Sequence, residues 1–116
     1  MSNQTPTDPL SLIIERNGST AVVKCHGKLV AGVSDYFYNS IRQLIPDTKK
    51  IVLDLSDLTR MDSMGLGALV RLYVSAKSAG CKLELINVGK QVQNLLGITD
   101  LWSVFATIGE RGIKMY

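Results

Sequence analysis

The sequence predicts one α/β domain, in which a mixed β-sheet is packed with helices. An antiparallel hairpin opens the chain, because two strand-like runs flank Asn17-Gly18, a strong turn signal. Helical and strand-like apolar patterns then alternate, as expected of right-handed β-α crossovers. The chain has 116 residues, of which 46% are hydrophobic and 20% charged, so it fits one compact domain with a core.

The first half predicts a hairpin, a helix and a buried strand. Residues 10–15 and 21–25 are the two strands of the hairpin, and Gly27 ends the second strand. Ser34 or Asp35 can cap a helix whose apolar positions reach Ile45, where Pro46 stops it. The apolar run 51–55 is typical of a strand covered on both faces.

The second half predicts two helices, each followed by a strand. The first helix carries an apolar stripe of Leu66, Leu69, Val70, Tyr73 and Ala76, and Gly80 lies just past its end. Residues 82–86 alternate as a strand. A short helix around residues 92–96 is ended by Gly97, and residues 104–106 form the last strand.

The start of the chain suggests a flexible extension at residues 1–9, before a domain at residues 10–116. This segment is polar, contains Pro6 and Pro9, and lacks the regions of a signal peptide. No run approaches the roughly 20 apolar residues that cross a bilayer, so no membrane insertion is expected. We therefore expect a cytoplasmic protein.

Composition weighs against several function classes. The net charge of +3 comes from scattered residues, without the basic stripe of a nucleic-acid binder. Cys25 and Cys81 fall in strand-like segments and fit no metal spacing, so buried free thiols are expected. The single histidine, His26, is read as a partly exposed residue at a strand end. We therefore expect no enzyme, no metal and no cofactor.

Gly65-Leu66-Gly67 follows a strand and raises a nucleotide-binding alternative. A dinucleotide fingerprint needs a third glycine where this chain has Val70, and no phosphate-binding Gly-Lys-Ser/Thr ending is present. A tight turn with close helix–sheet packing is the favoured interpretation, and a small-molecule or nucleotide site is the weaker one.

The stretch of residues 61–67 (MDSMGLG) carries the main functional hypothesis. Asp62 and Ser63 are both favoured N-cap residues, so one of them is expected to cap the following helix. A phosphate on Ser63 would add about two negative charges where a helix tolerates anions. Such a site can change an interface without unfolding the domain.

Several segments of the sequence resemble a known family. Residues 51–58 (IVLDLSDL), 61–69 (MDSMGLGAL) and 80–86 (GCKLELI) resemble the STAS domain of bacterial anti-sigma factor antagonists. Residues 92–105 (VQNLLGITDLWSVF) are similar to that family's third helix and final strand. The likeness covers roughly residues 10–106 and implies the same STAS-like mixed sheet.

The resemblance implies partner switching in transcription regulation. It implies that the unmodified domain binds a serine-kinase anti-sigma factor, that the kinase phosphorylates Ser63 and ends binding, and that a phosphatase restores it. The implied partner-binding residues are Lys28, Asp62, Ser63, Met64 and Gly65.

Two departures from the family pattern bear on the partner. Met64 stands where many members have Ser or Thr, and Lys28 stands where early members often carry an acidic residue. A partner of different electrostatics is therefore expected. The alternative is a non-switched STAS subunit of a lipid-transport or stress-sensing assembly, in which Ser63 only caps a helix. The oligomeric state is left open, with a homo-oligomer as one alternative.

Overall fold

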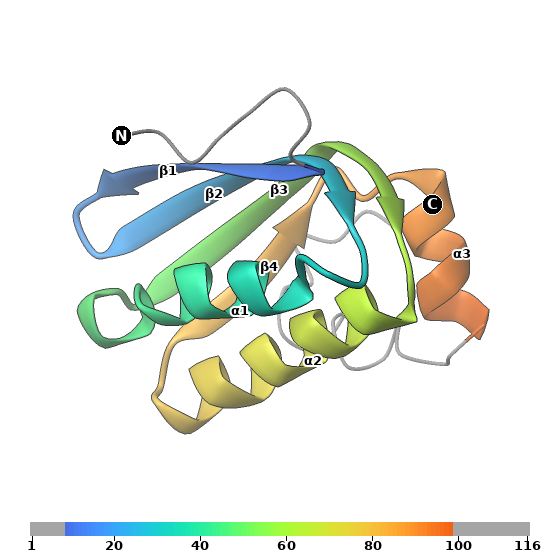
Figure 1. The fold of residues 1–116 in the computed structure, drawn as a ribbon. Coiled ribbons are helices and arrows are strands. Elements are labelled where there is room, and N and C mark those ends of the chain that lie inside the picture. Colours follow the sequence, from blue (N-terminus) through green and yellow to red (C-terminus); the bar gives the residue numbers. More distant parts are fainter. Residues whose placement is uncertain (1–8, 99–116) are drawn as a thin grey trace.

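The computed structural model describes residues 9–98, and these form a four-stranded mixed sheet with helices (Figure 1). The strands are β1 (Leu10–Asn17), β2 (Thr20–Leu29), β3 (Lys50–Met61) and β4 (Lys82–Ile86), in the order β1-β2-β3-β4. β1 pairs with β2 antiparallel, and β2, β3 and β4 run parallel to one another. The mixed sheet, its opening hairpin and the α/β class are confirmed.

The helices are α1 (Ser34–Arg42), α2 (Ser63–Ser78) and α3 (Lys90–Ile98), with the short 3-10 helix η1 (Ile45–Asp47) after α1. Figure 1 shows α1 and α2 side by side across one face of the sheet, with α3 beyond the end of β3. Gly80 has a φ of 75°, as expected of a glycine just past the end of α2. None of the helices described in residues 9–98 is long and apolar enough to cross a membrane.

The core lies between the sheet and the pair α1 and α2. Its largest fully buried side chains are Leu29, Phe37, Ile41, Ile51, Leu53, Leu55, Met61, Leu69, Leu72, Leu83 and Leu85. Cys25 and Cys81 are buried free cysteines, as expected. Burial, and then the charge of Asp54, raise the pKa of Cys25 to about 12, so its thiol stays protonated at neutral pH.

Several boundaries differ from the sequence expectation. β2 continues past Gly27 to Leu29, and β3 continues past residue 55 to Met61, because two register shifts let the pairing go on through Lys28–Arg60 and Leu29–Met61. β3 was expected to be covered on both faces, but Val52 and Asp54 on the outer face are only half-buried, since α1 and α2 share the other face.

The helix boundaries also need three corrections. Val33, without a side-chain bond, is the N-cap of α1, so neither Ser34 nor Asp35 caps it. The helix stops at Arg42, and Ile45 belongs to η1 instead. Gly97 lies inside α3 rather than ending it. The expected strand at residues 104–106 lies outside the described residues.

Candidate functional site

Asp62 fixes the turn between β3 and α2. It occupies the N-cap of α2, where its Oδ1 accepts a hydrogen bond from the Gly65 N–H at 3.0 Å. Its Oδ2 accepts another from the Ala31 N–H at 2.9 Å, in the segment between β2 and α1. The sequence left open which residue caps α2, and the structure assigns that role to Asp62.

The carboxylate of Asp62 is stabilised in its charged form. The Ala31 N–H, and next the Gly65 N–H, hold its pKa below the ordinary value, against a smaller opposing effect of burial. The Met64 N–H and the positive charge of Arg60 act in the same direction as the first two. A negative charge is therefore present beside Ser63 at neutral pH.

Ser63 is the first residue of α2 and its side chain is exposed. Within residues 9–98 its hydroxyl has no hydrogen-bond partner, because Asp62 already serves as the cap. Met64 follows with 56% of its surface exposed. The first turn of α2 therefore presents a hydroxyl and a thioether side chain to solvent at its positive end.

Gly65 is buried, and packing explains why it is glycine. A Cβ at this position would overlap the carbonyl oxygen of Leu29 and lie 2.9 Å from its carbonyl carbon. The start of α2 thus approaches the end of β2 more closely than any side chain allows. Among the described residues, Gly67 has no atom from beyond its own helical turn within 4 Å of its Cβ position, so the packing interpretation is confirmed for Gly65 alone.

Lys28 is brought to the same end of the sheet. It is exposed on β2 and lies opposite Arg60 on β3, one residue before the buried pair Leu29 and Met61. The fold therefore gathers Lys28, Asp62, Ser63 and Met64, with Gly65 buried beneath them.

Gln91 is a positioning residue that sequence reasoning missed. Its Oε1 accepts a hydrogen bond from the Met61 N–H at 2.9 Å, and its Nε2 donates to the Met61 carbonyl at 3.0 Å. These two hydrogen bonds hold the start of α3 against the end of β3. No local sequence pattern marks a contact between residues 30 positions apart.

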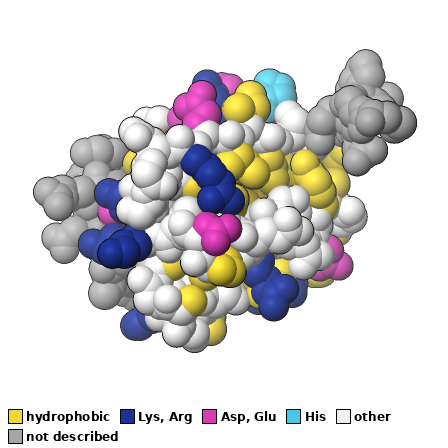
Figure 2. All heavy atoms as spheres, turned by 90° about the vertical axis from the view of Figure 1, so that its left-hand side faces the viewer, with side chains coloured by type: hydrophobic (Ala, Val, Ile, Leu, Met, Phe, Trp, Pro, Cys, Tyr) yellow, Lys and Arg dark blue, Asp and Glu magenta, His cyan; other side chains and the backbone are white. Residues whose placement is uncertain are grey.

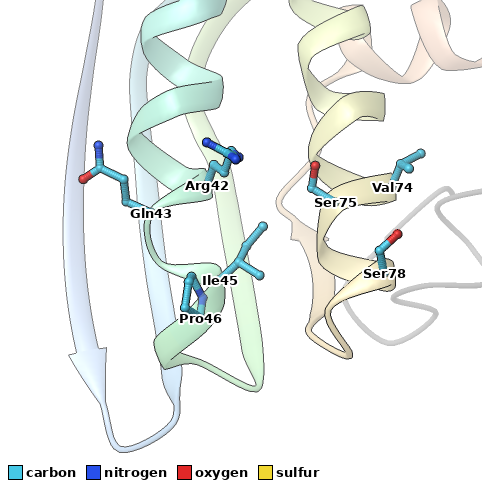
Figure 3. Close-up of a pocket in the computed structure, with 7 residues that line it drawn as sticks. All are labelled: Arg42, Gln43, Ile45, Pro46, Val74, Ser75 and Ser78. Atoms are coloured by element: carbon cyan, nitrogen blue, oxygen red, sulfur yellow. The ribbon is translucent and has the colours of Figure 1, made fainter.

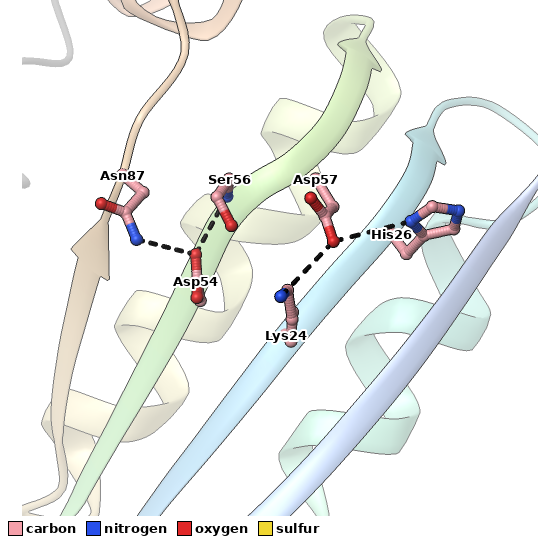
Figure 4. A network of polar contacts seen from close by, with 6 residues as sticks. All are labelled: Lys24, His26, Asp54, Ser56, Asp57 and Asn87. Carbon is pink, nitrogen blue, oxygen red and sulfur yellow. Dashed lines mark hydrogen bonds and ion pairs between the residues drawn. The ribbon is translucent and has the colours of Figure 1, made fainter.

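The outer face of the sheet holds a polar network that the sequence did not reveal (Figure 4). Asp57 Oδ2 lies 3.5 Å from Lys24 Nζ and 3.8 Å from His26 Nδ1. The His26 side chain is 67% exposed, and 3.8 Å is too long for the hydrogen bond that orients a general base. We interpret Lys24 and Asp57 as a surface ion pair, with the His26 ring beside it.

Asp54 is a further polar residue on this face. Asp54 accepts hydrogen bonds from the Asn87 side chain and the Ser56 N–H, both at 3.0 Å. In the part of the chain that the structure describes, no group of three or more His, Cys, Asp or Glu could hold a metal ion.

A surface pocket lies between the C-terminal ends of α1 and α2 (Figure 3). Arg42, Ile45, Val74 and Ser78 are among its lining residues. It sits at the opposite end of α2 from Gly65, so it gives no support to a nucleotide site at the Gly65-x-Gly67 turn.

Comparisons with known proteins match this architecture. The family model described as the STAS domain matches residues 11–111. A Thermotoga neapolitana protein described as an anti-sigma factor antagonist is 36% identical over 67 residues, which are 58% of this chain and 52% of that protein. The chain thus matches about half the length of that relative.

Solved structures share the fold at lower identity. An anti-sigma factor antagonist from Mycobacterium paratuberculosis has a TM-score of 0.75 at 19% identity, covering 88% of this chain and 87% of that one. The anti-sigma factor antagonist SpoIIAA in its unphosphorylated form has a TM-score of 0.69 at 19% identity. The match covers 78% of this chain and 82% of that one. Since the family model spans most of the sequence, the chain belongs to the STAS domain family.

Proposed function

We propose that this chain is an anti-sigma factor antagonist that works by binding, not by catalysis. In this proposal the turn around Ser63 binds a serine-kinase anti-sigma factor and so frees a sigma factor. Phosphorylation of Ser63 by that kinase ends binding, and a phosphatase restores it. Asp62, Met64 and Lys28 contribute the surrounding contact surface, and Gly65 shapes the turn from below.

The observation that carries the proposal is that Asp62, and not Ser63, caps α2. Asp62 caps α2, so the Ser63 hydroxyl is exposed and is not needed to hold the helix. A kinase can therefore reach it, and a phosphate there would not remove a structural bond. The new charge would lie at a helix N-terminus, which favours anions.

Relatives described as anti-sigma factor antagonists support the proposal. The Thermotoga relative is described as an anti-sigma factor antagonist, and SpoIIAA is known in unphosphorylated and phosphorylated forms. For this chain, the kinase, the phosphatase and the modification of Ser63 are proposals.

The test is affinity capture from the native cells with Ser63→Ala and Ser63→Asp as bait. Ser63→Ala should retain the partner, because it cannot be phosphorylated, and Ser63→Asp should lose it. Ser78→Asp is the matched control, since Ser78 is the exposed last residue of the same helix. It should capture the partner like the wild type.

Two outcomes would contradict the proposal. Equal capture by Ser63→Asp and wild type would show that the partner does not read Ser63. Capture of a membrane-transport complex by all three variants would favour the non-switched subunit instead.

A further inference from the structure

Three exposed cations lie around the Ser63 turn. Lys28 and Arg60 face each other across β2 and β3, and Lys90 is the first residue of α3. The hydrogen bonds from Gln91 to the Met61 backbone place the start of α3 beside the end of β3. We call Lys28, Arg60 and Lys90 the basic patch.

The basic patch is not neutralised within residues 9–98. None of the ion pairs found there includes Lys28, Arg60 or Lys90. Of the nearby carboxylates, Asp62 accepts two backbone N–H groups and lies near enough to Arg60 to be influenced by its charge, and Asp57 lies 3.5 Å from Lys24 Nζ. Among the described residues, the three cations at this end of the sheet thus outnumber the one carboxylate, Asp62, that is influenced by one of them.

The arrangement works against stability. Like charges directly opposite on neighbouring strands repel, and a cation at a helix N-terminus opposes the helix dipole. Lys50 and Lys82 also face each other at the other end of the sheet, but there Glu84 lies 3.8 Å from Lys50 Nζ. Folding alone therefore does not account for the basic patch.

The opposite end of the molecule has a different surface. Figure 2, viewed from the left-hand side of Figure 1, shows basic and acidic side chains interspersed around exposed hydrophobic surface. Within residues 9–98, Lys28 and Arg60 differ from the opposed pair Lys50 and Lys82 at that end, because neither of them forms an ion pair with a carboxylate.

The backbone beneath the basic patch is held in place. The Lys28 N–H donates to the Pro9 carbonyl at 2.6 Å, and the Thr59 hydroxyl donates to the Gly27 carbonyl at 3.0 Å. The Asp62 N–H donates to the Leu29 carbonyl at 3.3 Å. The cations are therefore carried on a preorganised surface, which lowers the cost of binding.

Met64 supplies an apolar contact beside these charges, with 56% of its surface exposed. An apolar anchor next to a charged rim is the usual anatomy of a protein interface. Charge complementarity then requires carboxylates on the partner's surface, facing Lys28, Arg60 and Lys90.

We propose that the basic patch docks an acidic surface of the partner protein, that Met64 enters an apolar site there, and that phosphate on Ser63 cancels the patch's charge. This inference rests on the proposed function for the existence of a partner. Arg60 already lies close enough to influence the charge of Asp62, the residue next to Ser63. A phosphate on Ser63 would add about two negative charges three residues along the chain from Arg60.

The first test needs no partner: thermal unfolding of Lys28→Glu, with Lys49→Glu as a control. Lys49 is exposed and precedes β3 at the opposite end of the sheet. Lys28→Glu turns a like-charge pair with Arg60 into an attractive one, so its midpoint should rise above that of Lys49→Glu. An equal or lower midpoint would overturn the claim that Lys28 and Arg60 repel each other.

The second test measures association with the protein that Ser63→Ala captures, after its purification. Lys28→Glu and Arg60→Glu should each slow association about three- to tenfold at low salt, and Lys49→Glu should not. Raising the salt should slow the wild type and shrink these differences.

The outcomes separate this inference from the function on which it rests. Binding that ignores both reversals would overturn the basic patch and leave the proposed function standing. Faster binding by the reversed variants would show a basic partner surface instead. Failure of Ser63→Ala to capture any partner would overturn both.

Discussion

Asp62 and Ser63 are neighbours of similar helix-capping preference, and the structure gives them different tasks. The Asp62 carboxylate holds the first turn of α2 and the Ala31 segment, with one oxygen on each. Ser63 is left exposed with no capping bond to lose. At the residue scale, modification of Ser63 and stability of the turn are therefore separable.

The first prediction measures that separation by urea unfolding at pH 7. Asp62→Ala should lower the free energy of unfolding by about 1–2 kcal/mol, because it removes the cap. Ser63→Ala should change it by less than about 0.5 kcal/mol, as is usual for a surface substitution. The reverse ranking of the two variants would show that Ser63 is the cap.

The second prediction concerns pH and follows from the lowered pKa of Asp62. Its unfolded pKa is about 3.9, and its folded pKa lies lower, so its stabilisation is fully present above the unfolded value. That stabilisation is lost as the pH falls through the folded pKa. Wild type and Asp62→Asn should therefore differ by a constant amount from pH 7 to about 5, and the difference should shrink below about pH 4.

Urea unfolding of both proteins between about pH 2.5 and 7 checks this expectation. Asp62→Asn is a suitable comparison because it keeps a side-chain acceptor while removing the titrating charge. A difference that stays constant across the whole range would contradict a charged cap.

At the scale of elements, the sequence predicts the centres of strands and helices better than their ends. Alternation and apolar runs located β3 and β4, because burial against the helices selects those residues. β1 is mostly exposed, and the turn signal Asn17-Gly18 is what located it. The extensions of β2 to Leu29 and β3 to Met61 were missed. Those residues pair through shifted registers between distant segments, and the pairing leaves no local pattern.

The candidate site shows the same limit. The stretch of residues 61–67 identified the turn and its two candidate caps, Asp62 and Ser63, from sequence alone. The choice of Asp62 as cap depends on Ala31, and the placement of α3 depends on Gln91 meeting Met61. Each contact joins residues about 30 positions apart, which single-sequence patterns do not record.

The third prediction tests the close approach of α2 to β2 with two glycines of the same helix. Gly65→Ala should destabilise the protein by about 1–3 kcal/mol, because its Cβ would overlap the Leu29 carbonyl. Gly67→Ala should be neutral or stabilising by up to about 1 kcal/mol, since its Cβ position is open and alanine favours helix.

Thermal or urea unfolding of the two variants gives the comparison directly. Equal effects of the two substitutions would mean that helix propensity, rather than the contact with Leu29, governs both positions.

At the scale of the whole molecule, the fold separates its core from the proposed interface. α1 and α2 cover one face of the sheet (Figure 1). Ser63 begins α2 just after the end of β3, Lys28 and Arg60 lie near the ends of β2 and β3, and Lys90 begins α3. Because Ser63 is exposed, a charge added to it lies at the surface and not in the core. Under the proposed function, partner binding changes while the domain stays folded.

The most direct test of the central claim is site-resolved mass spectrometry. Wild type and Ser63→Ala are each incubated with the purified partner and magnesium ATP, and circular dichroism is recorded before and after. We predict one phosphate on wild-type Ser63, none on Ser63→Ala, an unchanged spectrum and release of the partner from the wild type only. An unmodified Ser63, or release of the partner with phosphate at another residue, would contradict the account.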